Sequence, residues 1–220
     1  MGFQRARSAE QRQERRETIL AAAAGMLREM PVAALTLSEL SRRVGLAKSN
    51  VLRYFESREE VLLEVLMRSA TACIVELDEA WAAKGLGDTP LPERIEAFAA
   101  VYARVAAAHP DLLDLVSAQA SVLERNVSTD AIVRFKRAAL AGLDVLGGVI
   151  ARAIPELGDH APAAGSLMLT LSGAVYAQSE QSRLCESAYL VDPALAVFRV
   201  ELVPALQSAV ATVIAGTLAR

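Results

Sequence analysis

Residues 36–58 constrain the fold most, because their pattern predicts short helices on either side of a glycine turn. Thr36 and Glu39 have the spacing of a capping box, in which the threonine side chain accepts a hydrogen bond from the amide of residue 39 and the glutamate reaches back. Gly45 follows where a left-handed residue ends a helix without Cβ strain. A further short helix over residues 47–55 completes the order of elements of a helix-turn-helix.

The rest of the chain predicts helices and no strands, because alanine and leucine recur at helical spacing with few β-branched or aromatic runs. A first helix is expected over residues 9–30, and a second capping box at Ser57 opens a long helix that reaches about Ala83. Residues 85–92 contain two glycines and two prolines and are expected to form a loop. Further helices are expected near 93–108, 110–124, 129–153, 161–185 and 193–219. We therefore expect an all-α protein of about nine helices.

Charge divides the chain at Arg58. Residues 1–58 carry eleven Lys and Arg against six Asp and Glu, a net charge of +5, whereas residues 59–220 carry twelve against twenty, a net charge of −8. A basic amino-terminal part on an acidic body attracts and orients a polyphosphate, although chance asymmetry produces the same numbers.

The exposed side of the third helix has the chemistry that duplex DNA requires, and a helix of this kind fits the major groove. A generic helical hairpin shows the same spacing, so both alternatives stay open on the residues alone. The polar side chains that offer hydrogen bonds to phosphates and base edges are Lys48, Ser49, Asn50, Arg53 and Tyr54.

The run of residues 36–62, TLSELSRRVGLAKSNVLRYFESREEVL, resembles the DNA-binding region of the tetracycline-repressor (TetR) family. The likeness covers about residues 14–65, and it includes the Tyr-Phe pair and the acidic opening of the helix that follows. It implies an all-α homodimer, usually a repressor, in which a ligand bound in the carboxy-terminal body alters the separation of the two recognition helices. The implied domains are a helix-turn-helix DNA-binding domain over 1–58 and a ligand-binding and dimerisation domain over 59–220.

The resemblance also implies roles for single residues. Thr36 would hold its helix against a phosphate, and the polar residues from Lys48 to Arg53 would contact the groove. Tyr54 and Arg58 would bind backbone phosphates. Arg58 has separate support, because the amides at the start of a helix also favour a phosphate.

Two positions depart from the family pattern. Ala47 stands where Ser or Thr usually caps the recognition helix, so about 1 kcal/mol of local stabilisation is expected to be missing. Leu52 stands where a tyrosine is common, which removes one hydroxyl contact. The five arginines before Glu17 either form an arm along the minor groove or simply solvate the first helix.

The segments 161–185 and 193–219 are nearly continuous in small and apolar residues, so one subunit is not expected to bury every face of both helices. We expect a homodimer through these helices; the alternative is that both belong to the core of a monomer. The small residues expected to allow close packing across the two-fold axis are Gly165, Ser166, Gly173 and Ala209.

Several polar-tipped residues lie within apolar helices, as a pocket for an unidentified small and mostly apolar effector requires. Each of them is also common in ordinary cores. These candidates for the ligand pocket are Trp81, Tyr102, His109, Gln119 and Tyr176.

We expect neither an enzyme nor a metal or cofactor site. His109 and His160 sit in no recognisable nucleophile, acid-base or metal pattern, and Cys73 and Cys185 belong to no metal or disulfide motif. The basic first residues are not followed by an apolar run, so no secretory signal and a cytoplasmic location are expected. Residues 160–179 lack formal charge but are too polar for a bilayer, so no membrane partner is expected.

These observations predict a DNA-binding transcriptional regulator, most simply a homodimeric repressor that a small ligand releases from its operator. One alternative is a DNA-binding regulator without a small-molecule effector, such as an activator or a regulator controlled by a protein partner. Another is an all-α ligand-binding protein that does not bind DNA.

Overall fold

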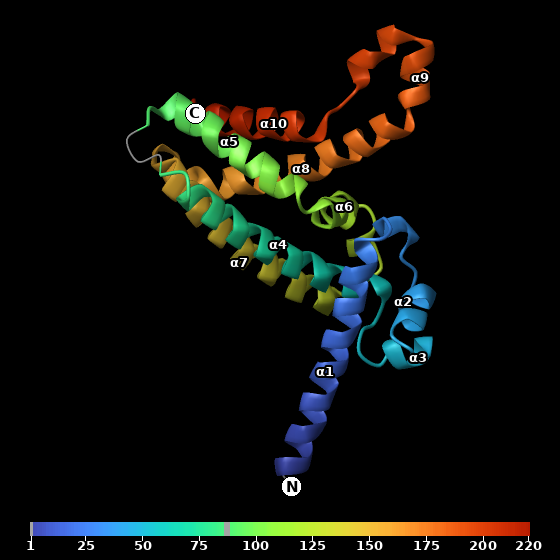
Figure 1. The fold of residues 1–220 in the computed structure, drawn as a ribbon. Helices are drawn as coiled ribbons and strands as arrows, with labels where there is room; N and C mark the ends of the chain where they lie inside the picture. Colours follow the sequence, from blue (N-terminus) through green and yellow to red (C-terminus); the bar gives the residue numbers. More distant parts are fainter. Residues whose placement is uncertain (1, 86–88) are drawn as a thin grey trace.

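The computed structural model describes residues 2–85 and 89–220, with side chains from residue 10 onward, and within these ranges the chain is helical without strands. The predicted all-α fold is confirmed. A small head contains α1 (Gly2–Leu27), α2 (Leu37–Arg43) and α3 (Lys48–Val51), and α4 (Arg58–Ala82) continues from it into the body (Figure 1). The body contains α5 (Leu91–Ala107), α6 (Pro110–Gln119), α7 (Thr129–Ala153), α8 (Ala161–Leu184), α9 (Glu186–Val191) and α10 (Leu202–Leu218).

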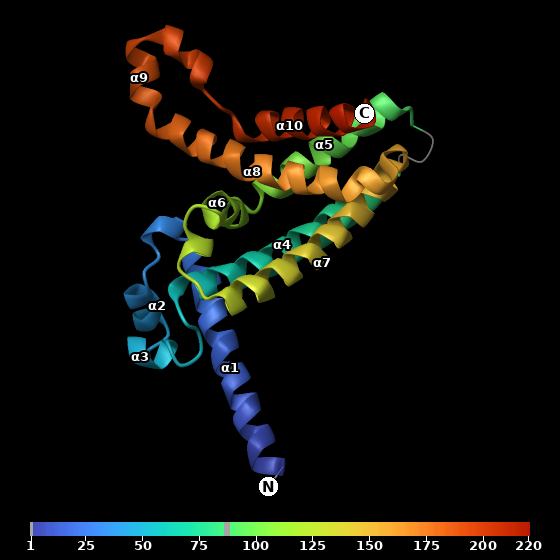
Figure 2. The same cartoon turned by 180° about the vertical axis from the view of Figure 1, so that it is seen from behind.

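The arrangement separates the two ends of the chain. From both sides of the molecule α4 and α7 are seen to run side by side, with α5, α8 and α10 at the end of the body that lies away from α1 (Figure 2). The amino-terminal half of α1 projects past α2 and α3. No helix of the described ranges is both long and apolar enough to cross a membrane.

Local capping explains where the helices of the head begin. The Thr36 hydroxyl accepts a hydrogen bond from the Glu39 amide (3.2 Å), as predicted, but the Glu39 carboxylate binds Arg42 instead of reaching back. The Ser57 hydroxyl likewise accepts from the Glu60 amide (3.1 Å). Gly45 takes the predicted left-handed conformation, with φ of 67°.

Some predicted boundaries are wrong. The helix α1 begins at Gly2 instead of residue 9. The helix α3 ends at Val51 instead of residue 55, and residues 52–55 form hydrogen-bonded turns. Of the predicted loop 85–92, residues 86–88 lie outside the described residues, and α5 already begins at Leu91.

The largest correction concerns the predicted helix 193–219. It is a 3₁₀-helix over Pro193–Phe198, followed by an extended link and α10, and the short α9 precedes it. The reason is proline chemistry: Pro204 lacks an N–H and its ring clashes with the carbonyl four residues earlier, so it is tolerated only in the first turn of a helix.

Two apolar clusters form the core. The body cluster is built around residues such as Phe98, Ile150 and Leu206. The head cluster contains buried residues of α1 to α3, and it also contains Leu112 of α6 and Phe135 of α7. The head is therefore packed onto the body instead of standing apart from it.

Candidate nucleic-acid interface

The residues predicted to contact DNA lie on α3 and the turn after it. Lys48, Ser49, Asn50 and Arg53 are all exposed, and the side chains of Lys48 and Arg53 form no ion pair within the described residues. Val51 and Phe55 are buried beneath them and fix the position of the helix. The cap residue Ala47 makes no side-chain hydrogen bond, as expected of alanine at this position.

Thr36 and Arg58, which are also predicted to contact phosphates, differ in their exposure and in their hydrogen bonds. Thr36 is exposed, and its hydroxyl accepts one hydrogen bond, so its proton is free to donate to a phosphate oxygen. The Arg58 side chain is 17% exposed; its guanidinium donates to the Leu35 carbonyl (2.9 Å) and to the Glu59 carboxylate (3.1 Å). Arg58 therefore joins the start of α4 to the chain before α2.

Arg16 joins α1 to the turn after α3. Its guanidinium lies 4.1 Å above the centre of the Phe55 ring and donates to the Tyr54 carbonyl and to the Glu64 carboxylate. These contacts join α1, the turn after α3 and α4. The sequence offered no signal for them beyond the position of Arg16 on the first helix.

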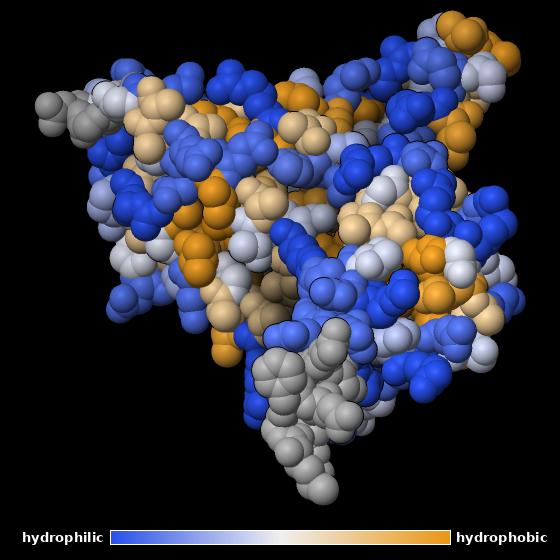
Figure 3. Space-filling model, turned by 60° about the horizontal axis from the view of Figure 1, so that its bottom comes forward, coloured by the Kyte–Doolittle hydropathy of each residue, from blue (hydrophilic) through white to orange (hydrophobic). Residues whose placement is uncertain are grey.

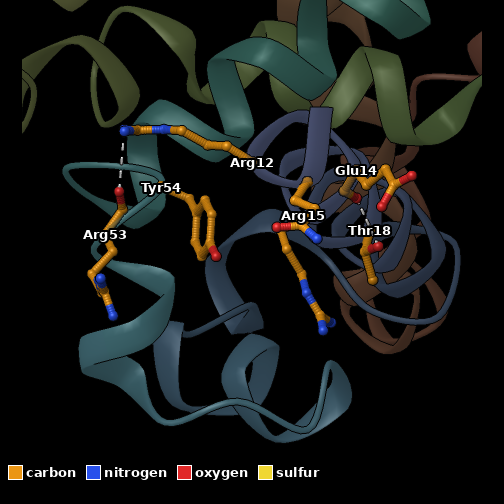
Figure 4. A pocket seen from close by; sticks show the side chains of 7 residues that line it. Arg12, Glu14, Arg15, Thr18, Arg53 and Tyr54 are labelled. Carbon is orange, nitrogen blue, oxygen red and sulfur yellow. Dashed lines mark hydrogen bonds between the residues drawn. The ribbon is translucent and has the colours of Figure 1, made fainter. Parts of the chain in front are cut away.

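A hollow of about 680 Å³ opens between α1 and the turn after α3. Arg12 reaches across it and donates to the Arg53 carbonyl (3.4 Å), and the Tyr54 ring lies between the side chains of Arg53 and Arg15 (Figure 4). We call this hollow the arginine cradle. It is lined by Gln11, Arg12, Glu14, Arg15, Thr18, Arg53 and Tyr54. Of the five arginines before Glu17, the side chains of Arg5 and Arg7 lie outside the described residues.

Polar contacts join the head to α6 in the body. The Asp114 carboxylate of α6 accepts a hydrogen bond from the Val32 amide (2.7 Å), just before α2. Burial raises the pKa of Asp114 above its ordinary value, although the Val32 amide opposes this shift.

A second set of contacts joins the head to α7. The Glu56 carboxylate accepts from the Ser128 amide (2.5 Å) at the start of α7, and this bond lowers the pKa of Glu56. Arg134 of α7 pairs with Glu60 at 2.8 Å. The head is thus held by hydrogen bonds and ion pairs as well as by apolar packing.

The body contains an apolar cavity of about 600 Å³ between α4, α5, α6, α7 and α8. Two of the predicted pocket residues line it. The Tyr102 hydroxyl is hydrogen-bonded to Ser172 (3.0 Å), and the Gln119 amide donates to Glu124 (2.8 Å). Burial raises the pKa of Tyr102 to about 12, so its hydroxyl stays protonated. A cavity of this size and lining suits a drug-sized apolar molecule.

The other predicted pocket residues are not among those that line the cavity. Trp81 packs edge-on against Phe98 at a centroid distance of 5.3 Å, and Tyr176 lies against the body cluster. His109 is hydrogen-bonded to Glu76 (2.7 Å) at the start of α6. Within the described ranges, no group of three or more His, Cys, Asp or Glu could hold a metal ion.

The glycines expected at a dimer interface serve another purpose. A Cβ on Gly165 would approach Ile150 of α7 at 3.0 Å, and one on Gly173 would approach Val116 of α6 at 2.8 Å. Both glycines therefore allow close packing of α8 inside the subunit. Ser166 is exposed and Ala209 is half-buried.

Exposed apolar surface gathers elsewhere on α8, on α10 and on the segment between them. The projecting segment, residues 186–198, contains no buried residue, and its Leu190 and Phe198 side chains are 75% and 67% exposed. Apolar side chains are visible at the tip of the projection at the upper right of Figure 3. Small or apolar residues also occupy the exposed faces of the two helices, namely Leu167 on α8 and Val203, Thr212, Ala215 and Gly216 on α10. The exposed Thr170, Ala174 and Ala177 of α8 line the cavity.

Comparisons with known proteins agree with this architecture. Residues 19–65 match the family described as bacterial regulatory proteins, tetR family, and residues 67–220 match the tetracyclin repressor-like C-terminal domain. A TetR transcriptional regulator from Rhodococcus sp. RHA1 is 17% identical, with a TM-score of 0.53; the match covers 94% of this chain and 96% of that one.

A TetR/AcrR-family transcriptional regulator from Thermobifida fusca is 19% identical, with a TM-score of 0.41, and the match covers 92% of this chain and 98% of that one. No curated protein matches the chain.

Proposed function

The chain belongs to the TetR family of bacterial regulatory proteins, and from this premise we propose that it is a homodimeric repressor, which a small and mostly apolar molecule releases from its DNA operator. Membership makes it a DNA-binding transcriptional regulator, and proteins of this family are in general not enzymes. The observation that supports ligand control most directly is the apolar cavity of about 600 Å³, because α6 forms part of its wall and is also bonded to the head.

In this proposal residues 1–58 bind the operator and residues 59–220 form the dimer and hold the ligand. Lys48, Ser49, Asn50 and Arg53 of each recognition element contact one major-groove face, with Thr36 and Tyr54 on the flanking phosphates. Arg58 fixes the start of α4, through its bond to the Leu35 carbonyl, and so positions the helix amides toward the same strand.

The dimer is proposed to form through α8, α10 and the projecting segment. Their exposed apolar side chains need a cover, and a second copy provides a self-complementary one through two-fold symmetry. Replacing Leu190 and Phe198 together by Ser removes two of the most exposed apolar side chains and is expected to weaken dimerisation at least about tenfold, which sedimentation equilibrium measures. Val145→Ser is the matched control, because Val145 is 59% exposed on α7, away from the proposed interface.

Ligand control is proposed to run through α6. Leu113 and Val116 of this helix line the cavity, whereas Leu112 also packs in the head cluster, and Asp114 between them binds the Val32 amide. A ligand that binds better when α6 is displaced shifts the dimer toward a state in which the two heads no longer match adjacent major-groove faces.

Two measurements test the proposed function. Selection from a random DNA pool identifies the operator, and failure to enrich any sequence would contradict operator binding. Operator affinity is then measured by fluorescence anisotropy with increasing 1-anilinonaphthalene-8-sulfonate, an apolar probe for the cavity. We expect the wild type to lose affinity at least about tenfold and Ala139→Trp to respond much less, because the indole occupies part of the cavity and competes with the probe. Equal affinities with and without saturating probe would contradict ligand control through this cavity.

A further inference from the structure

We infer that α1 carries a phosphate-binding site of its own: the arginine cradle, formed by Arg12, Arg15, Arg53 and Tyr54, binds the DNA backbone beside the groove that receives α3. The inference rests on the proposed binding of an operator and adds contacts by Arg12 and Arg15, to which the family likeness assigns no role. Arg12 and Arg15 precede the residues matched by the tetR family, which begin at residue 19.

The backbone of α1 places these arginines beside the recognition element. The chain is helical from Gly2, so the described segment is not an extended arm of the kind that follows a minor groove. Arg12 and Arg15 are three residues apart and therefore share a face of the helix. Figure 4 shows Arg12 extended toward the Arg53 carbonyl and Arg15 on the other side of the Tyr54 ring from Arg53.

Neighbouring arginines of α1 have different partners, and the cradle keeps its positive charge. Arg16 is committed to the Tyr54 carbonyl, to Glu64 and to the Phe55 ring, and it holds α1 in place. Arg12 donates to a neutral carbonyl, so its charge is not compensated by that contact.

The acidic residues of α1 do not cancel this charge. Glu17 points to the other side of the helix, where it pairs with Arg68, and this bond lowers its pKa to about 2. Among the residues that line the cradle, Glu14 is the single acid against three guanidinium groups.

The chemistry of the cradle fits a phosphate better than a base edge. Guanidinium groups match phosphate oxygens in a bidentate fork, and the Tyr54 hydroxyl adds a further donor. The cradle is also set to the side of Lys48, Ser49 and Asn50, which occupy the short helix that enters the groove. It supplies the free cations that Arg58 does not, because the Arg58 guanidinium is bonded inside the head.

The test uses the full-length protein and the selected operator. Operator affinity is measured between about 50 and 300 mM KCl for the wild type, Arg12→Gln and Arg15→Gln, because each phosphate contact contributes about 0.9 to the slope of log affinity against log salt concentration. A dimer has two cradles, so each substitution is expected to reduce the slope by about two and to weaken binding to every operator variant by the same factor.

Two further variants test whether the position of the charge and the shape of the guanidinium group matter. Arg104→Gln removes the same charge from an exposed position on α5 and is expected to leave the slope near the wild-type value. Arg15→Lys keeps the charge and is expected to retain the slope while losing part of the affinity. Because the substituted side chains are exposed, circular dichroism and melting temperature should match the wild type.

The outcomes distinguish this inference from the proposed function. If the wild type binds its operator but Arg12→Gln and Arg15→Gln behave like Arg104→Gln, the cradle is not a phosphate site and operator binding stands. If these substitutions change which bases are preferred at one operator position, the arginines contact bases instead, and the inference is overturned. A wild type that binds no DNA would overturn the proposed function itself.

Discussion

The arginine cradle of the head and the ion pairs of the body use basic side chains in different ways. In the body, such side chains pair with carboxylates across helices, as Arg152 of α7 does with Asp78 of α4 at 2.7 Å. In the head, the three arginines of the cradle form no ion pair within the described residues and face solvent, and Glu14 is the single acid among the residues that line the hollow. Like charges held close together are unfavourable for folding alone, so this cluster indicates a surface shaped for a polyanion.

The apolar cores show the opposite relation, because there the two regions are continuous. The head cluster contains Leu112 of α6 and Phe135 of α7 together with Phe55 after α3. A shared core implies that head and body unfold together and that a displacement in the body reaches the head. The following measurements test how far the two regions act as one unit.

The largest effect is expected from truncating the aromatic core of each region. Phe55→Ala in the head and Phe98→Ala in the body should each lower the free energy of unfolding by about 3–5 kcal/mol, because both side chains are fully buried. Urea unfolding is followed by circular dichroism and by Trp81 fluorescence, which reports on the body. In Phe55→Ala both signals should shift together; a Trp81 transition that stays at the wild-type midpoint would mean that the head unfolds alone.

A smaller effect is expected from Gly173→Ala. The added Cβ would lie 2.8 Å from the Val116 side chain and 3.0 Å from the Ser117 amide nitrogen, so α6 must move, at a cost of about 1–3 kcal/mol. Because α6 is bonded to Val32, operator affinity should fall as well. Gly148→Ala on α7 is the matched control. The added Cβ would have a flexible Arg152 side chain as its nearest neighbour, at 3.6 Å, so the substitution should raise the free energy of unfolding by about 0.5–1 kcal/mol. Unchanged operator affinity in Gly173→Ala would argue against transmission through α6.

One helix cap in the head and one in the body are expected to contribute equally to stability, so their substitution compares the two regions. The Thr36 hydroxyl caps α2 and the Ser128 hydroxyl caps α7, each accepting a hydrogen bond of 3.2 Å. Replacing either by Ala should cost about 1 kcal/mol in chemical denaturation. We expect Thr36→Ala to weaken operator binding beyond its loss of stability, whereas Ser128→Ala should leave operator affinity nearly unchanged. Equal losses of affinity would remove the proposed role of Thr36 at a phosphate.

The smallest effect concerns pH and the link between α6 and the head. The pKa of Asp114 lies above its ordinary value of 3.8 because burial penalises the charged carboxylate. The folded state therefore holds this proton more tightly than the unfolded state, so stability relative to Asp114→Asn should fall as the pH rises through the raised pKa and then stay constant. Urea unfolding of both proteins between about pH 3 and 7 measures the difference. A stability relative to Asp114→Asn that rises with pH over this range would contradict the raised pKa.

Local signals predicted much of the fold. The predicted helix 129–153 matches α7, since Ser128 caps its start and Pro155 follows its end. The capping hydrogen bonds of Thr36 and Ser57 and the left-handed Gly45 were predicted from neighbouring residues alone. The break before α10 was missed although Pro204 signals it, because the apolar pattern on both sides looked continuous.

Contacts between residues far apart in the chain could not be predicted from the sequence. Gly165 and Gly173 were predicted to face a second subunit, but their close neighbours lie on α7 and α6. Tyr102 and Gln119 line the cavity and Trp81 does not, which depends on how five helices meet. Spacing along one helix defines a face but does not say which other helix covers it.

The sequence by itself therefore determined most of the helices, the helix-turn-helix and the basic character of the head, because propensity, capping and net charge act within a few residues. The tertiary structure alone decided which cations are available. Arg58 was predicted as a phosphate contact, yet the Leu35 carbonyl and the Glu59 carboxylate engage it, whereas Arg12 and Arg15 gather with Arg53 at an open hollow. The physical reason is that a charge becomes free or paired only when residues far apart in the chain are brought together.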